Sequence, residues 1–264
     1  MSSMRDWALA LPSQGRFTFT TAEARAASGG TSDAAVAAAL DRAEADRIIA
    51  SPVRGFHVVL PLEDRGTGTP SWRLFLDPLM THLGLPYYVG LLTAAAIHGA
   101  SGQAAQVVQV VTPRARRPVR SGRLVIEFVV RRTAARAPVE LRTTPSGRMR
   151  VATPELVALD LVRYPAKAAG WGNVATVLRD LAPSLRRAGM RAAFAVEPTA
   201  PELQRLGHLL ERAGAEPVLA VLEAELATRR VGWVPLIPGD TGDSDAAARD
   251  VRWHVLVSAE PEVD

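Results

Sequence analysis

The spacing of apolar residues in the first 60 positions changes from a helical period to a strand period. Val36, Leu40 and Ala43 recur at the three- and four-residue intervals that place side chains on one face of a helix. Shortly afterwards, apolar residues alternate around a turn, as in a β-hairpin. The pattern predicts helices over residues 4–11, 20–27 and 33–45, and strands over 47–50 and 56–60 around a turn at 51–55.

Polar residues mark where the second and third helices begin. Thr20 and Glu23 have the spacing of a capping box. Gly29-Gly30 ends the second helix, and either Thr31 or Ser32 caps the third. Two helices joined by a glycine turn and followed by a hairpin have the element order of a winged helix-turn-helix.

A change of composition after the hairpin predicts a domain boundary. Residues 61–70 are polar and rich in glycine and proline, which is typical of a linker. The expected fold class is α+β, a winged helix-turn-helix followed by a larger mixed domain. The expected divisions are 1–62 for a winged helix-turn-helix DNA-binding domain, 63–71 for the linker and 72–264 for the C-terminal domain.

Helical and strand patterns are mixed in the second domain. Runs of β-branched residues predict strands, and Pro154 is favourable in the first turn of a helix. The expected elements are helices over 72–83, 91–98 and 153–163, strands over 107–111 and 124–130, a hairpin over 139–152, and a helix opened by a second capping box at 199–202.

Composition narrows the class of protein. The 264 residues include no cysteine, which excludes disulfides and thiolate metal sites and is expected of a cytoplasmic protein. No apolar run reaches the roughly 18 residues of a membrane span, and residues 1–11 lack the apolar core of a signal peptide. The five histidines show no metal-ligand spacing. We therefore expect no metal, no cofactor and no membrane association.

Positive charge is concentrated in the middle of the chain. The formal net charge is +4, and the first 62 residues carry six acidic and six basic side chains. Residues 105–150 carry eleven arginines against Glu127 and Glu140 alone. The run from Arg114 to Arg123 is either a phosphate-binding surface or a solvated loop between two strands, and charge by itself carries no sequence information.

Several stretches of this sequence resemble the AbiEi antitoxins of type IV toxin–antitoxin systems. The resemblance runs from about Phe19 to Leu181, and its most specific part is the block from Tyr87-Tyr88-Val89-Gly90 to His98-Gly99-Ala100. The other stretches are 54–61, 106–112, Thr153-Pro154-Glu155 and 159–162. The sequence departs from the family at Gly102 and Ala105, where relatives often have His and Pro, and in acidic residues on the third helix, Asp33, Asp41 and Asp46.

The resemblance implies an antitoxin that opposes a nucleotidyltransferase-like toxin of the AbiEii kind without forming a stable complex with it. It also implies that the N-terminal domain binds inverted repeats in double-stranded DNA at the protein's own promoter and represses the operon, with the protein a monomer in solution. Three alternatives stay open: a stand-alone winged-helix regulator whose C-terminal domain senses a ligand, an enzyme with a hidden site, and a protein that sequesters the toxin's tRNA or nucleotide substrate.

The expected DNA contacts lie on the third helix, on the hairpin and in the arginine-rich run. Polar or basic side chains can contact phosphates, and alanine methyl groups can contact thymine methyl groups. Arg54 at the hairpin tip is a phosphate or minor-groove contact, or else a solvated turn residue. The candidates are Thr21, Thr31, Ser32, Ala35, Arg42, Arg47, Arg54, Arg114, Arg116 and Arg117.

Catalytic motifs are not expected. Gly29-Gly30-Thr31-Ser32-Asp33 is similar to the glycine loop of a nucleotidyltransferase, but that chemistry needs two carboxylates on a following strand. Here Asp41 and Asp46 follow in a predicted helix. His98 ends an apolar helix and is interpreted as a core residue or helix cap. The chain is thus predicted not to be an enzyme, with no catalytic residues.

Overall fold

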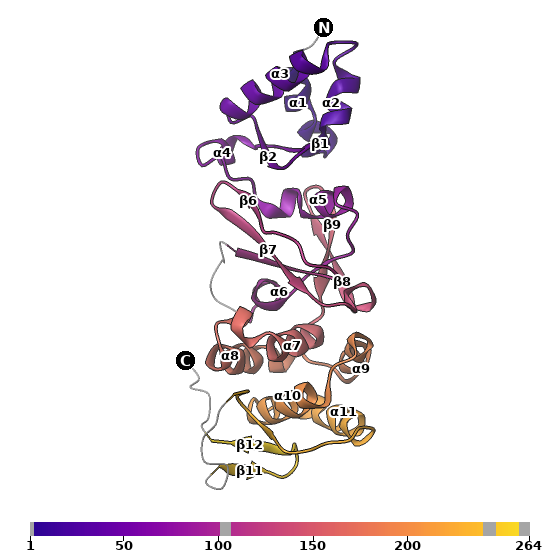
Figure 1. Ribbon diagram of the computed structural model, residues 1–264, viewed down its shortest axis with the longest axis vertical. Helices are drawn as coiled ribbons and strands as arrows, with labels where there is room; N and C mark the ends of the chain where they lie inside the picture. Colours follow the sequence, from indigo (N-terminus) through magenta and orange to yellow (C-terminus); the bar gives the residue numbers. More distant parts are fainter. Residues whose placement is uncertain (1–2, 101–106, 240–246, 259–264) are drawn as a thin grey trace. The chain divides into compact units, whose positions relative to one another are not determined.

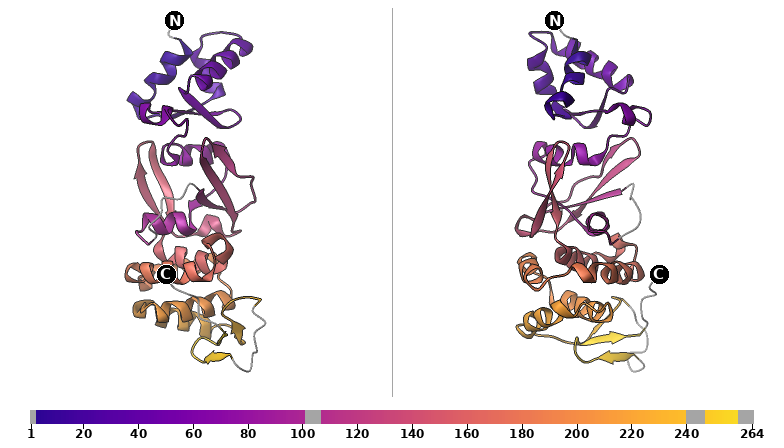
Figure 2. Two further views of the ribbon diagram at one scale, coloured as in Figure 1. Left: turned by 90° about the vertical axis from the view of Figure 1, so that its left-hand side faces the viewer. Right: turned by 180° about the vertical axis from the view of Figure 1, so that it is seen from behind.

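The computed structural model describes residues 3–100, 107–239 and 247–258. The chain forms two compact units, each built from three separate stretches of the sequence. Unit 1 comprises Met1–Tyr87, Ala105–Arg131 and Leu141–Arg150, and unit 2 comprises Tyr88–Ala104, Arg132–Glu140 and Val151–Asp264. Helices and strands are mixed (Figures 1 and 2), which confirms the predicted α+β class. Gly102, Ala105 and Gln106, which entered the family comparison above, lie outside the described residues.

The first 60 residues of unit 1 contain the three predicted helices and the predicted hairpin. An additional strand, β1, precedes the second helix and pairs antiparallel with β3, so the sheet has the order β1-β3-β2 (Figure 1). This is the element order of a winged helix-turn-helix. The bounds are α1 (Met4–Ala10), η1 (Pro12–Gln14), β1 (Thr18–Thr20), α2 (Thr21–Ala27), α3 (Asp33–Ala45), β2 (Ile49–Val53) and β3 (Phe56–Val59).

The core beneath these helices is built around Phe19 of β1. Its ring is 2% exposed and meets Trp7 edge to face, with the ring centroids 4.9 Å apart. The predicted stripe of α3 (Val36, Leu40 and Ala43) is buried in the same cluster. Both predicted caps are present: Thr20 accepts from the amide of Glu23, and Ser32 caps α3. Local capping and a small shared core therefore fix this fold.

The segment predicted to be a linker makes specific contacts within unit 1. It contains α4 (Leu62–Arg65) and precedes η2 (Trp72–Leu74). The backbone amide of Arg123 donates to Thr69 Oγ1 at 3.0 Å. A β-carbon on Gly122 would lie 2.1 Å from the same oxygen, so only glycine allows this approach. The boundary at 63–71 stays a prediction.

The rest of unit 1 is mainly β-sheet. Strands β5 and β7 are parallel over their whole length, from Val107↔Val125 to Thr112↔Val130, and β6 pairs antiparallel with β7. The predicted strands and hairpin are confirmed, whereas the predicted helix over 72–83 is shorter than expected. The bounds are α5 (Leu76–His82), β5 (Val107–Thr112), β6 (Val119–Ser121), β7 (Leu124–Val130), β8 (Val139–Thr144) and β9 (Gly147–Ala152), the last two being neighbours whose outer ends enter unit 2.

Unit 2 is organised around α7, whose residues 155–162 are all buried. Its neighbours include α6, α8, α9 and α10, and Figure 2 shows α10 and α11 side by side. The helices are α6 (Leu91–Ile97), η3 (Ala134–Arg136), α7 (Pro154–Arg163), η4 (Pro165–Ala168), α8 (Trp171–Leu181), η5 (Ala182–Ser184), α9 (Arg187–Ala193), η6 (Phe194–Val196), α10 (Ala200–Arg212) and α11 (Glu216–Ala227). The strands are β4 (Tyr88–Val89), which pairs parallel with the end of β9, and β10 (Val234–Pro235), β11 (Ala248–Asp250) and β12 (Val255–Val257).

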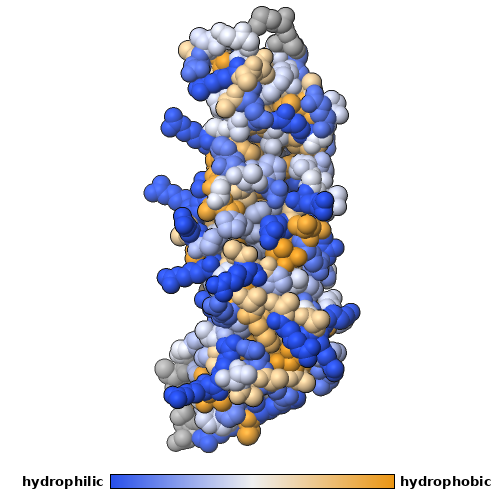
Figure 3. Space-filling model, turned by 90° about the vertical axis from the view of Figure 1, so that its right-hand side faces the viewer, coloured by the Kyte–Doolittle hydropathy of each residue, from blue (hydrophilic) through white to orange (hydrophobic). Residues whose placement is uncertain are grey.

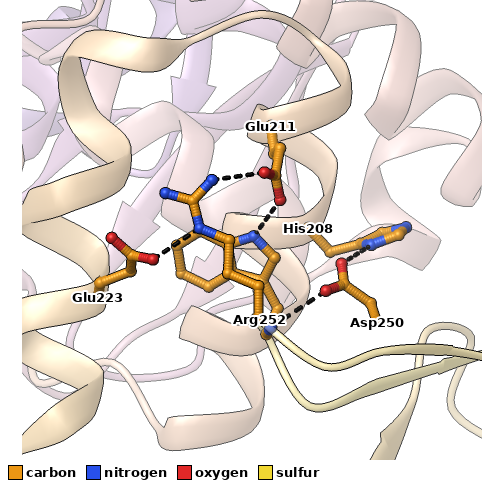
Figure 4. Close-up of polar contacts among 6 residues, drawn as sticks. His208, Glu211, Glu223, Asp250 and Arg252 are labelled. Carbon is orange, nitrogen blue, oxygen red and sulfur yellow. Dashed lines mark hydrogen bonds and ion pairs between the residues drawn. The ribbon is translucent and has the colours of Figure 1, made fainter.

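A set of charged residues fastens the segment between β11 and β12 to α10 and α11. Figure 4 shows Arg252 between Glu211 and Glu223, and His208 against Asp250. The His208 Nδ1 and Asp250 Oδ2 atoms are 2.6 Å apart, and the indole of Trp253 donates to Glu211 at 2.6 Å. The fully buried Trp253 ring lies directly on Gly207 of α10.

We predict that replacing Gly207 by alanine lowers the free energy of unfolding by about 1–3 kcal/mol, the usual cost of overpacking a core. The added β-carbon would lie 2.1 Å from a ring carbon of Trp253, so the ring must move. Gly232→Ala is the matched control, because no atom lies within 4 Å of its β-carbon position. Urea unfolding of both variants is the measurement, and equal stability would show that the ring is not tightly seated.

Candidate nucleic-acid interface

The turn between α2 and α3 is built from short polar residues that cap each other locally. Thr31 Oγ1 donates to the carbonyl oxygen of Ser28 at 2.8 Å, and Ser32 Oγ accepts from the amide of Ala35 at 3.3 Å. Thr31, Ser32 and Ala35 are all exposed. The local hydrogen bonds fix the turn and leave the outer surfaces of these residues accessible.

Three of the candidate residues line one groove of unit 1. Thr31, Ala35 and Arg42 border a groove of about 470 Å³ that also contacts Trp7 and Met4 of α1. Ala35 and Arg42 lie on one flank of α3, two turns apart. The structure therefore brings these three candidates together along a single face.

Two of the three acidic residues that depart from the family, Asp33 and Asp46, are paired within unit 1. Asp33 pairs with Arg25 at 3.0 Å, and Asp46 pairs with Arg5 at 3.7 Å. Glu44 accepts from Ser51 Oγ at 2.8 Å. These contacts reduce the repulsion that the acidic residues of α3 would exert on a phosphate backbone.

The tip of the hairpin is short and tied to α2. Arg54 is exposed and precedes Gly55, whose φ of 80° lies in the left-handed region that favours glycine. The carbonyl oxygen of Gly55 accepts from the amide of Thr21 at 3.1 Å. Thr21 is thus half-buried against the hairpin, whereas Arg54 points into solvent.

His57 of β3 connects to α2 and β2, and it was missed by the sequence reasoning. Its Nε2 atom lies 2.9 Å from Thr21 Oγ1, and its Nδ1 atom lies 2.9 Å from Ser51 Oγ. The ring is 7% exposed and stacks on Phe19. Burial lowers the pKa of His57 below its usual value, although the nearby Glu44 carboxylate acts in the opposite direction.

Arg47 is separated from the other candidates. Its guanidinium donates to the carbonyl oxygen of Gly66 at 2.6 Å, at the end of α4. Its backbone has a φ of 53°, which is uncommon for a residue with a side chain. In this structure, Arg47 holds the segment that follows the hairpin. A basic residue next to a strand gave no signal of this role in the sequence.

Arg114, Arg116 and Arg117 form a second group, on the exposed loop between β5 and β6 of unit 1. The carbonyl oxygen of Arg114 accepts from Thr112 Oγ1 at 2.8 Å, which fixes the start of the loop. None of the three lines the groove of Thr31, Ala35 and Arg42. The candidate interface therefore consists of two separate sets of residues.

Several residues that carried the family resemblance have structural roles in unit 2. Tyr88 OH donates to the fully buried Asp160 at 2.9 Å, and Glu155 accepts from the amide of Arg186 at 2.7 Å. His98 ends α6, and its Nε2 atom lies 2.7 Å from the carbonyl oxygen of Ala152. The prediction that His98 is a helix cap is confirmed.

No group of three or more His, Asp or Glu side chains is placed to hold a metal ion in the described part of the chain. Among the same residues, none of the helices is long and apolar enough to span a membrane.

Comparison with known proteins relates one region of the chain to a family. Residues 88–212 match the family model of the AbiEi antitoxin C-terminal domain, and this match confirms the resemblance to that family. No curated protein matches the chain. The chain has the fold of the RV2827C protein from Mycobacterium tuberculosis, at 16% identity and a TM-score of 0.64, over 95% of this chain and 89% of that one.

We predict that the stability of the protein falls as the pH drops below about 6.5, the ordinary pKa of histidine, and that His57 contributes to this fall. Because the folded-state pKa of His57 is lowered, the unfolded chain binds the proton first, and acid favours unfolding. His57→Gln removes this titration, so its stability should depend less on pH than that of the wild type between about pH 5 and pH 7. Urea unfolding across this range measures the slope, and identical slopes would contradict the assignment.

Proposed function

We propose that this protein is the antitoxin of a type IV toxin–antitoxin system, that it opposes a nucleotidyltransferase-like toxin and that it represses its own operon by binding inverted repeats in the promoter. The observation that carries the proposal is the combination of an AbiEi antitoxin C-terminal region with an N-terminal winged-helix element order. The protein acts as a binding protein in the cytoplasm, without catalysis. Antagonism without a stable complex with the toxin is part of the proposal.

The accessible surface of α3 and the hairpin supports the DNA-binding part. Thr31, Ser32 and Arg42 are exposed polar or basic groups on α3 and its turn, and Arg54 is exposed at the hairpin tip. Ala35 presents a methyl group that can contact thymine. Phosphate contacts position a protein on DNA, and sparse base contacts are then supplemented by DNA shape.

The arginine-rich loop supports a sequence-independent contribution to affinity. Arg114, Arg116 and Arg117 are exposed, and each phosphate that they neutralise releases counterions. Arg47 and Thr21 hold the hairpin and its flanks in place, so we propose that they act on DNA through the geometry of the winged helix.

We predict that Arg42→Ala and Arg54→Ala each weaken binding to the protein's own promoter by about fivefold, which corresponds to about 1 kcal/mol. Arg230→Ala is the matched control, because Arg230 is an exposed arginine of unit 2. Gel-shift titration at fixed salt is the measurement. Wild-type affinity in both variants would exclude this face of the winged helix from the interface.

The triple variant Arg114→Ala/Arg116→Ala/Arg117→Ala separates the second set from the first. If the loop contacts phosphates, affinity falls on all DNA sequences alike, and the slope of log affinity against log salt decreases by up to about three. An unchanged slope would show that the three arginines of the loop do not contact phosphates.

We predict that the full-length double variant Arg42→Ala/Arg54→Ala loses promoter repression and still protects cells from the cognate toxin when supplied in trans. The reason is that both residues lie in unit 1 before the family-matched region 88–212. A promoter reporter and a toxin co-expression assay measure the two activities. Loss of protection by the folded variant would favour the stand-alone regulator, in which the toxin is controlled only through transcription.

A further inference from the structure

A groove in unit 2 is not used by the proposed DNA-binding function. It lies between α9 and α11 and has a volume of about 510 Å³. Arg187 and Arg191 of α9 form one side, and Phe194, Val221 and Ala224 form an apolar floor. Figure 3 faces the side of the molecule that carries α9 and α11 and shows apolar surface between long hydrophilic side chains at their level.

The two arginines give this groove a positive rim. Arg187 and Arg191 are exposed and lie four residues apart, on successive turns of one helix face. Neither makes an ion pair within the part of the chain that the structure describes. Arg187 Nε donates to the carbonyl oxygen of Pro217 at 2.9 Å, which orients its side chain beside α11.

The acidic residue among the lining residues of the groove is already paired. Glu225 of α11, at the other side of the groove, lies 2.5 Å from Arg229. Because Glu225 is paired with Arg229, Arg187 and Arg191 are the charged lining residues left without an ion pair in the described part of the chain. The electrostatic complement of this surface is therefore acidic.

The floor favours apolar side chains over a sugar–phosphate backbone. Val221 is buried and Phe194 is half-buried, and small alanine side chains line the rest of the groove and leave it open. A cavity of this volume accommodates large apolar side chains from a partner. Nucleic acids bound through bases generally need aromatic stacking surfaces, and Phe194 is the single aromatic residue among the groove's lining residues.

We propose that the groove between α9 and α11 docks an acidic amphipathic helix of a partner protein. Apolar side chains of the partner, one turn apart, enter the groove, and carboxylates on the same spacing pair with Arg187 and Arg191. This is the helix-in-groove mode of peptide recognition. The inference goes beyond the proposed function and is independent of it, because the groove lies in unit 2 and the candidate DNA contacts lie in unit 1.

The test uses the full-length protein and a synthetic peptide as the probe. The peptide is an amphipathic helix with leucines at i and i+4, flanking glutamates, a fluorescent label and a photo-crosslinker on one leucine face. A second peptide with glutamine in place of each glutamate measures the electrostatic contribution. We expect fluorescence anisotropy to show binding of the acidic peptide, about tenfold weaker binding of the glutamine peptide, and crosslinks to α9 and α11.

Two variants of the protein address the rim and the floor separately. Arg187→Glu/Arg191→Glu reverses the rim charge, and Ala224→Trp fills the groove without changing charge. Each should weaken binding of the acidic peptide by about tenfold or more. Arg230→Glu is the matched control, because it makes a charge reversal at an exposed arginine outside the lining residues of the groove. It should leave the affinity within about twofold of the wild type.

Circular dichroism and thermal unfolding verify that each variant is folded. If the charge-reversed variant does not fold, Ala224→Trp still tests the proposal. Unchanged affinity in the folded variants, or crosslinks confined to other elements, would overturn the proposal. A single-stranded oligothymidine is the second probe. If it bound and the α9 and Ala224 variants weakened its binding, while the acidic peptide did not bind, the groove would be assigned to nucleic acid and the proposal would be overturned. Promoter binding is measured in parallel, so failure of the DNA-binding proposal is distinguishable from failure of this one.

Discussion

Unit 2 depends on the pairing of two carboxylates that α7 carries into the core. A helix buried on every side has no solvent in which to place a polar side chain, and an unpaired buried carboxylate costs several kcal/mol. Glu155 meets the amide of Arg186, just before α9, and Asp160 meets the hydroxyl of Tyr88. Gly189 has no side chain because its β-carbon would lie 2.4 Å from the Glu155 carboxylate. The bond from Tyr88 to Asp160 explains why the Tyr87–Ala100 block and residues 159–162 occur together in one sequence, since the block supplies the hydroxyl group that pairs the buried carboxylate.

The N-terminal part of unit 1 depends on a different arrangement, centred on the buried ring of His57. His57 lies between the hydroxyl groups of Thr21 in α2 and Ser51 in β2. The Ser51 hydroxyl also donates to Glu44, near the end of α3. A sheet of three short strands has little apolar area to stabilise it. The stacked Phe19 and the hydrogen-bonded His57 therefore join β1, β2 and the first residue of α2 to β3.

The sequence predicts the local features of this fold well and its tertiary contacts poorly. Helices α2 and α3 were located because their caps, Thr20 with Glu23 and Ser32, act within a few residues. Strand β1 was missed because three residues are too few to show a period, and its place is set by pairing with β3. The interpretation of Arg47 shows the same limit: its charge was visible, whereas its contact with Gly66 joins residues 19 positions apart. The groove of α9 and α11 likewise exists only once the two helices are packed.

The bond between the hairpin tip and the first residue of α2 has a consequence for how this protein can diversify. The carbonyl oxygen of Gly55 accepts a hydrogen bond from the amide of Thr21. An insertion at the tip that moves Gly55 therefore leaves this amide, at the start of α2, without its acceptor. Lengthening of this hairpin is therefore constrained by the start of α2. Side-chain exchange is easier on the exposed alanines of α3, where a larger residue meets solvent and leaves the core intact.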